Sequence, residues 1–227
     1  MDRVFDVVTF DCYGTLIDWE EGISSAILSA AERDGRELER AAVLRAYSEI
    51  EPQVEGESFR PYREVLAETA SRVAARFGWE LPAERASFLA ESLPRWKPFP
   101  DTNAALARLA SQGYRLGILS NTDDDLLAAT RESLTASFSL VLTAQQMRSY
   151  KPGYRHFEAA RAQLGEARWL HAAQSYFHDV VPAHSLCIPS AWINRKGEAP
   201  SGTARPDFEF PSLAQMADFL CGAQESF

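Results

Sequence analysis

Four polar clusters in the sequence carry side chains suited to chemistry: Asp11, the segment from Ser120 to Thr122, Lys151 and Asp179. Asp11 directly follows the apolar, β-branched run Val4 to Phe10, which is typical of a fully buried strand. A charge is costly to bury there, and ligands of open α/β sheets bind at the carboxyl ends of the strands. Aspartate is also a common turn and cap residue, so position alone leaves Asp11 undecided between catalyst and cap.

The other three clusters also lie where predicted strands end. Ser120 to Thr122 follows an apolar run and would cap a helix, which also presents backbone amides to an anion. Lys151 precedes a proline, and Asp179 lies just past a second apolar run. A solvated lysine and a capping aspartate are the ordinary interpretations of the two when each is taken alone. Four such residues at one sheet edge, in this order, favour a functional site.

These residues would be positioned by a sheet built from the first strand and the second half of the chain. From residue 101 onward the sequence predicts alternating helices and strands, which is typical of a parallel sheet with helices on both faces. Strands are expected at 114–119, 140–143, 169–173 and 191–194. Helices are expected at 101–111, after Thr122, at 154–164, around 182–186 and at 213–220, with a loop over 196–206.

Between these parts, residues 20–97 contain no convincing strand. Apolar residues at helical spacing predict one helix around residues 23–31, a second over 39–51 that ends before Pro52, a third that stops near Gly78 and a fourth over 83–93. Residues 53–60 are expected to form a loop. A proline-rich junction at residues 97–100 is typical of a domain boundary. We therefore expect a core of residues 1–16 and 98–227 and an inserted helical cap of residues 17–97.

Composition limits the classes of partner. The 227 residues carry a formal net charge of −9, which argues against nucleic acid and requires local cations to capture an anionic substrate. No apolar run approaches the length of a membrane span, no secretory signal is visible, and the odd number of cysteines, three, suggests reduced thiols. We expect a cytoplasmic protein that binds neither membrane nor nucleic acid.

The four clusters, in order, resemble the motifs of the haloacid dehalogenase-like hydrolases. The matching segments read FDCYGT from Phe10, ILSNT from Ile118, YKP from Tyr150, and HD ending at Asp179, followed by AWINR from Ala191. The resemblance covers the whole chain, including the helical insertion after the first motif. It implies an α/β fold with a Rossmann-like, doubly wound parallel sheet and an inserted α-helical cap domain.

Two positions distinguish branches of this superfamily. Phosphatase members carry an aspartate two residues after the nucleophile as general acid, whereas this chain has Tyr13, as in the type II (S)-2-haloacid dehalogenases. A tyrosine is a poor acid for an alkoxide leaving group, but a halide needs no proton. Phosphatases also use an acidic residue four before the final aspartate to hold magnesium, and Ser175 stands there. We therefore expect (S)-2-haloacid dehalogenation without metal or cofactor.

The resemblance also implies roles for individual residues. Asp11 would attack C2 of a small carboxylic acid and form an ester, Lys151 would keep Asp11 ionised, and Asp179 would orient or deprotonate the water that releases a 2-hydroxy acid. The family's cap arginine, which faces the nucleophile, is assigned to Arg45, with Arg60 and Arg63 as rivals. The expected substrate-binding residues are Tyr13, Thr15, Arg45, Ser120, Asn121, Ser175 and Tyr176. The same resemblance implies a homodimer.

One departure puts the substrate in doubt. The dehalogenases that match best around the first motif have serine and asparagine where this chain has Gln174 and Tyr176. This chain reads SYFHD there, and its FDCYGTLIDWE start and its HD and SAWI segments resemble instead a hydrolase that opens the ring of azetidine-2-carboxylate. The nitrogen leaving group of that reaction can require a proton, and His178 is the candidate to supply it, although a histidine at a helix start without a catalytic role is the ordinary interpretation. Ring opening of a small cyclic 2-carboxylate is thus the first alternative. A magnesium-dependent phosphatase and a non-enzymatic binding protein are the remaining alternatives.

Overall fold

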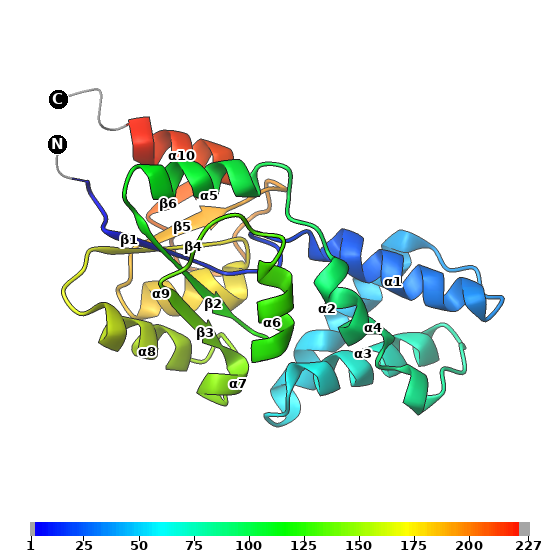
Figure 1. Ribbon diagram of the computed structural model, residues 1–227. Coiled ribbons are helices and arrows are strands. Elements are labelled where there is room, and N and C mark those ends of the chain that lie inside the picture. The colour runs from blue at the N-terminus through cyan, green and yellow to red at the C-terminus, as the bar shows by residue number, and fades with distance from the viewer. Residues whose placement is uncertain (1–2, 223–227) are drawn as a thin grey trace.

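In the computed structural model, residues 3–222 are described, and their sheet has six strands, all parallel, in the order β3-β2-β1-β4-β5-β6 (Figure 1). The strands are β1 (Val7–Phe10), β2 (Arg115–Ser120), β3 (Leu140–Thr143), β4 (Trp169–Ala173), β5 (Ser190–Ile193) and β6 (Phe208–Phe210). The expected α/β fold with a parallel sheet is confirmed.

Strand β1 lies in the middle of the sheet, and every one of its residues is buried. Phe10, the last residue of β1, is in register with Ile118 of β2 and Ala172 of β4. Because all strands run in the same direction, the residues after β1, β2 and β4 meet at one edge of the sheet. This register brings Asp11, Asn121 and Gln174 to the same edge.

Helices cover both faces of the sheet (Figure 1). Helices α5 and α10 pack against each other on one face, and α8 and α9 lie on the other. From residue 102 onward, the helices are α5 (Thr102–Ser111), α6 (Asp124–Arg131), α7 (Ala144–Met147), α8 (Arg155–Leu164), α9 (Val181–Ser185) and α10 (Leu213–Gly222). A π-helical turn, η3 (Tyr176–Val180), leads into α9.

The segment between β1 and α5 forms a block of helices that lies beyond the end of the sheet (Figure 1). It contains α1 (Trp19–Arg33), α2 (Arg40–Glu57), α3 (Tyr62–Arg76), η1 (Ala83–Arg85), α4 (Phe88–Ser92) and η2 (Leu93–Arg95). We call this block the cap. Its exact bounds, 17 and 97, stay a prediction. Its helices pack through the apolar faces that the sequence pattern indicates, including Ile23, Ile27, Leu66 and Val73, all fully buried.

Two predictions in the cap are wrong. Helix α2 continues through Pro52 to Glu57, so residues 53–57 are helical and not a loop. Packing against α3 outweighs the effect of the proline, which removes one backbone donor and leaves the carbonyl of Ser48 without its usual helical partner. The helix expected over 83–93 is broken into η1, α4 and η2.

Two short elements were not predicted. Strand β6 has three residues and pairs with β5 at the sheet edge, where Phe208 and Phe210 pack against Phe219. Helix α7 is a single turn after β3. Both lack the length that a periodic pattern needs to be recognised.

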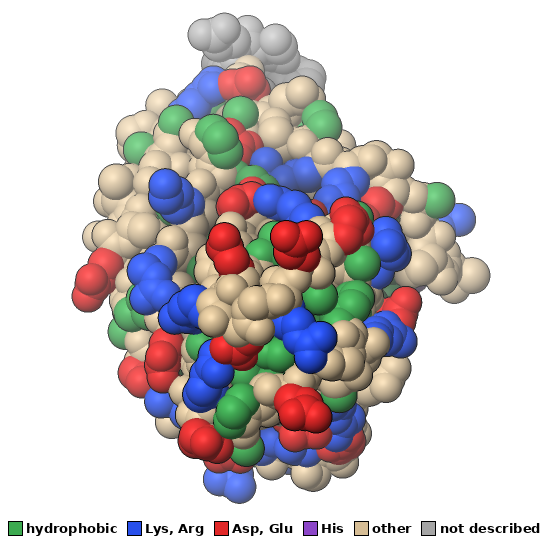
Figure 2. Space-filling model, turned by 90° about the vertical axis from the view of Figure 1, so that its right-hand side faces the viewer, with side chains coloured by type: hydrophobic (Ala, Val, Ile, Leu, Met, Phe, Trp, Pro, Cys, Tyr) green, Lys and Arg blue, Asp and Glu red, His purple; other side chains and the backbone are tan. Residues whose placement is uncertain are grey.

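The face of the molecule that the cap presents carries acidic and basic side chains side by side (Figure 2). The cap has exposed salt bridges, such as Arg76 with Glu49 and Arg40 with Glu21. Among the described residues, no helix is long and apolar enough to cross a membrane. All three cysteines are free thiols, as expected.

Candidate active site

A buried ammonium joins two of the predicted catalytic carboxylates. Lys151 Nζ lies 2.9 Å from Asp11 Oδ1 and 2.6 Å from Asp179 Oδ1, and it also donates to the carbonyl of Leu119 at 2.9 Å. The Lys151 side chain is 1% exposed, so these three acceptors replace its hydration. Burial opposes its charge, but Asp11 and Asp179 outweigh burial and raise the pKa of Lys151. The lysine therefore stays protonated.

The two carboxylates differ in how strongly they are held ionised. Burial raises the pKa of Asp11, while the Lys151 ammonium and a hydrogen bond from Thr15 Oγ1 at 2.9 Å oppose the rise. Burial also disfavours the charge of Asp179, but Lys151 and a hydrogen bond from His171 prevail and lower its pKa to about 2. Asp179 is thus a carboxylate at any physiological pH.

A chain of hydrogen bonds inside the sheet holds Asp179 in place. Trp169 Nε1 donates to Thr9 Oγ1 at 2.7 Å, Thr9 Oγ1 lies 2.8 Å from His171 Nδ1, and His171 Nε2 lies 2.9 Å from Asp179 Oδ1. A hydroxyl proton from Thr9 to Nδ1 leaves the Nε2 proton for the carboxylate. Oδ1 of Asp179 therefore accepts two donors, whereas Oδ2 is buried and has no partner among the described atoms.

The loops around Asp11 are fixed by reciprocal hydrogen bonds. Asn121 Oδ1 accepts from the backbone N–H of Lys151 at 2.7 Å, and its Nδ2 donates to the Lys151 carbonyl at 2.9 Å. Thr15 Oγ1 accepts from the backbone N–H of Gln174 at 2.8 Å while it donates to Asp11. The loops after β1, β2 and β4 are tied together in this way, so the geometry around Asp11 is fixed by hydrogen bonds to backbone atoms.

Asp11 and Asp179 open into a cavity of about 220 Å³ between the core and the cap. Its volume suits a small organic acid. From the core it is lined by Asp11, Tyr13, Asn121, Lys151, Gln174, Ser175, His178 and Asp179. From the cap it is lined by Trp19, Ile23, Tyr47, Ser48, Glu51, Pro52, Glu55, Tyr62 and Trp96.

The cap side of the cavity contains two carboxyl groups, Glu51 and Glu55, one helical turn apart on α2. Burial raises the pKa of Glu51 to about 7, and burial followed by repulsion from Glu51 raises that of Glu55 as well. Glu51 Oε1 accepts from Tyr62 at 3.1 Å, and Glu55 Oε2 lies 3.5 Å from Asn121 Nδ2. Sequence reasoning missed both residues, because Glu51 was the last residue of a helix expected to end before Pro52 and Glu55 was expected to lie in a loop.

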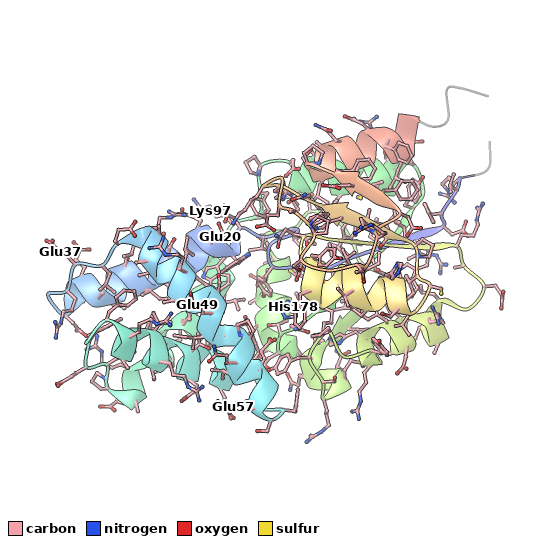
Figure 3. All side chains as sticks on the ribbon, turned by 180° about the vertical axis from the view of Figure 1, so that it is seen from behind. Glu20, Glu37, Glu49, Glu57, Lys97 and His178 are labelled. Carbon is pink, nitrogen blue, oxygen red and sulfur yellow. The ribbon has the colours of Figure 1, made fainter. Side chains whose placement is uncertain are left out.

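Tyr13 and His178 line the same cavity. The Tyr13 hydroxyl is 2.9 Å from Thr130 Oγ1, so it faces α6, and burial raises its pKa well above 10. Tyr13 is therefore no proton donor to a leaving group. His178 lies where the core faces the cap (Figure 3). Its Nδ1 is 3.1 Å from Ser175 Oγ and its Nε2 is 3.8 Å from Glu55 Oε2, and burial lowers its pKa to about 4.

The structure does not bring Arg45 to the cavity. Its side chain is 69% exposed, and its acidic neighbour is Glu39 at 4.0 Å. Successive helical residues are rotated by about 100°, which puts Arg45 roughly a quarter turn from the centre of the stripe that faces Asp11. The rivals Arg60 and Arg63 pair with Glu57 and with Asp123 and Asp125, respectively. Within residues 3–222, no arginine lines the cavity.

Three other expected substrate-binding side chains do not line the cavity. Tyr176 packs against Trp192, and its hydroxyl donates to the carbonyl of Ala204, because the π-helical turn directs it toward β5. Thr15 stands behind Asp11. Ser120 is fully buried, and its Oγ has no partner among the described atoms. Asn121, Ser175 and Tyr13 do line it.

Among the described residues, no group of three or more His, Cys, Asp or Glu side chains is placed to hold a metal. Ser175, at the position of the expected acidic ligand, uses its hydroxyl to accept the backbone N–H of His178 at 3.1 Å. Lys151, between Asp11 and Asp179, is the cation that balances the two carboxylates.

Residues 5–173 match the model of the haloacid dehalogenase-like hydrolases. Haloacetate dehalogenase H-2 of Moraxella sp. is 25% identical, with 96% of this chain and 93% of that protein covered. (S)-2-haloacid dehalogenase 4A of Burkholderia cepacia is 26% identical, with 93% and 90% covered. The structure of L-2-haloacid dehalogenase from Xanthobacter autotrophicus with chloropropionic acid covalently bound superposes with a TM-score of 0.80 at 22% identity, covering 96% and 99%.

Proposed function

Because the chain belongs to the haloacid dehalogenase-like hydrolases, we propose that it hydrolyses small carboxylic acids substituted at C2 through an ester formed on Asp11. The observation that carries this proposal is Lys151, whose Nζ bridges Asp11 and Asp179 at one end of a small cavity. A buried nucleophilic carboxylate next to a fixed ammonium and a second carboxylate is the arrangement that ester formation and ester hydrolysis require.

In the first step, an Asp11 oxygen attacks C2 of the substrate. The bond from C2 to the leaving group breaks, and the leaving group departs with the electron pair. Lys151 and Thr15 hold Asp11 in its reactive orientation through their hydrogen bonds to Oδ1 and Oδ2. The product of this step is an ester between Asp11 and the acid.

In the second step, water attacks the ester carbonyl of Asp11 and releases a 2-hydroxy acid. Asp179 Oδ2 is the free acceptor for that water, since Oδ1 is already held by Lys151 and His171. With a pKa of about 2, Asp179 orients the water more than it stores the proton, which is released as the ester breaks. One oxygen of the regenerated Asp11 carboxylate then comes from water.

A halide is the first leaving group to consider. Haloacetate and (S)-2-haloacids are in the names of relatives that match nearly the whole chain. A halide needs no proton, which agrees with the Tyr13 hydroxyl being turned toward Thr130. We therefore propose (S)-2-haloacid dehalogenation as the default activity.

A single turnover in heavy-oxygen water tests the mechanism. Enzyme in excess is mixed with (S)-2-chloropropionate, and the peptide that contains Asp11 is weighed by mass spectrometry. We expect one heavy oxygen in Asp11, and none in the (R)-acid control. The Asp11→Asn variant should release no chloride. Turnover with all the label in the hydroxy acid product and none in Asp11 would contradict the ester.

One observation favours a second leaving group. The cap wall of the cavity holds Glu51 and Glu55, and no arginine lines the cavity within the described part of the chain. A pair of carboxyl groups offers no cation to a departing halide, whereas a protonated nitrogen is attracted to the pair and favours its ionised form. Ring opening of a small cyclic amine that carries a 2-carboxylate is therefore the second candidate, by the same attack of Asp11 on C2.

The assembly and the location of the protein also belong to this proposal. We propose a homodimer and a cytoplasmic enzyme. Size-exclusion chromatography with light scattering checks the first, with a mass of one chain as the contrary result, and cell fractionation checks the second.

A further inference from the structure

The cap wall opposite Asp11 is built to accept hydrogen bonds. Glu51 and Glu55 face the cavity from successive turns of α2, and the Glu55 side chain is 6% exposed. Pro52 between them has no amide proton, so the carbonyl of Ser48, which also lines the cavity, receives no helical hydrogen bond from that position. These three groups lie on one stripe of one helix.

Among the described residues, no lysine or arginine forms an ion pair with either carboxyl group. Glu55 Oε2 is 3.5 Å from the Asn121 amide nitrogen and 3.8 Å from His178 Nε2, and Glu51 Oε1 accepts from the Tyr62 hydroxyl at 3.1 Å. Lys151, the cation of the cavity, is held by Asp11 and Asp179. A halogenated acid would add an anion to a cavity that already has an excess of carboxylates. A zwitterion would add no net charge and would place its cation against the wall.

A second, independent observation indicates that this cavity binds a ligand. Asp179 lines it, is fully buried, and leaves Oδ2 without a hydrogen-bond partner among the described residues. The cavity wall also carries the side-chain donors of Trp19, Gln174 and Ser175, which suit a substrate carboxylate. The cavity thus offers donors for an anionic group and acceptors for a cationic one.

We propose that Glu51 and Glu55 are catalytic residues that bind the protonated nitrogen of the substrate, which departs from C2 when Asp11 attacks. This inference rests on the proposed ester mechanism with the ring nitrogen, the second candidate, as the leaving group. It adds the residues that bind this nitrogen. A ring ammonium has two N–H bonds, and the wall offers one carboxylate to each.

The reaction balances with groups that are present. Asp11 forms the bond to C2, the bond from C2 to nitrogen breaks, and its electron pair stays on nitrogen, which becomes a neutral primary amine. Water then splits the ester, and the proton released in that step is taken up by the amine. The product is an ammonium-bearing 2-hydroxy acid, and no oxidant or reductant is needed. The carboxylates bind the ring ammonium while the bond from C2 to nitrogen breaks.

The test compares two substrates in four proteins. The full-length wild type, Glu51→Gln, Glu55→Gln and the control Glu49→Gln are assayed with azetidine-2-carboxylate and with (S)-2-chloropropionate. Glu49 is on the same helix but is 57% exposed and paired with Arg76 (Figure 3). We expect Glu55→Gln and Glu51→Gln to lower kcat/KM for the ring substrate at least a hundredfold and by a much larger factor than kcat/KM for the chlorinated acid, while Glu49→Gln matches the wild type with both substrates.

If the two residues had a purely structural role, kcat/KM would fall by the same factor for both substrates. That result overturns the inference, and so does an unchanged kcat/KM for the ring substrate in both variants. Circular dichroism and the melting temperature establish that each variant is folded. Heavy-oxygen labelling of Asp11 separates the two proposals. Label with the chlorinated acid but no turnover of the ring substrate by the wild type overturns this inference alone. Turnover without label in Asp11 from either acid overturns the ester mechanism.

Discussion

Asp123 Oδ1 accepts a 2.7 Å hydrogen bond from the backbone N–H of Tyr62, the first residue of cap helix α3. Oδ2 of the same carboxylate accepts from the backbone N–H and the Nε of Arg63, both at 3.1 Å. Helix α3 starts after Pro61 and has no side-chain cap of its own. An aspartate of the core, two residues after Asn121, therefore caps a helix of the cap and holds the two parts of the site together.

Removing this carboxylate should loosen the cap. Asp123→Ala leaves two backbone donors of α3 unpaired, and an N-cap of this kind is worth about 1–2 kcal/mol. We expect that loss of unfolding free energy in urea titrations, together with a higher KM. Asp125→Ala is the matched control, because Asp125 is 68% exposed and pairs only with the side chain of Arg63. Equal effects of the two variants would show that the cap does not depend on Asp123.

His171 should matter for the second step and not for the first. His171→Phe keeps an aromatic ring against Phe157 but removes the donor at 2.9 Å from Asp179 Oδ1. The carboxylate that orients water is then less fixed, so we expect kcat to fall about tenfold to a hundredfold. Because ester formation does not use Asp179, the Asp11 ester should accumulate, which intact-protein mass spectrometry during turnover would detect. A fall in kcat with no adduct on the protein would place His171 before the ester.

The sequence predicted the parallel sheet and the meeting of Asp11, Lys151 and Asp179 at one edge of it, because both depend on local patterns. Apolar runs end at Asp11, Ser120 and Ala173, and parallel strands bring their carboxyl ends to one edge whatever the detailed packing. Which side chains of α2 line the cavity depends on whether the helix continues past Pro52. The sequence predicted a helix that ends before Pro52 and therefore placed Glu55 in a loop. In the structure α2 continues to Glu57, which places Glu55 one turn after Glu51. Arg45 was chosen by its distance along the chain, which does not determine the direction of a side chain.

The two substrates should depend on pH in different ways. Above about pH 7 Glu51 is an anion, and below it the carboxyl is neutral and attracts an ammonium less. Other groups that face it are Tyr47, Tyr62 and Glu55, while His178, with a pKa of about 4, and Asp179, at about 2, keep their charge state above pH 5. The ratio of kcat/KM for azetidine-2-carboxylate to that for (S)-2-chloropropionate should therefore rise through about pH 7, since Asp11 acts on both. A flat ratio would contradict this.

Glu51 should also lower the stability of the protein at alkaline pH. Its pKa rises from 4.5 to about 7 on folding, so between these values the folded state binds more protons than the unfolded state, and stability falls as pH increases. Glu51→Gln cannot ionise and should be more stable than the wild type at pH 8, by up to about 3 kcal/mol, and equal to it near pH 4. Glu49→Gln, whose carboxylate is exposed, should show no such pH-dependent gain. Urea titrations of the three proteins at both pH values measure the difference, and a gain that is the same at pH 4 and pH 8 would mean that packing, and not charge, is responsible.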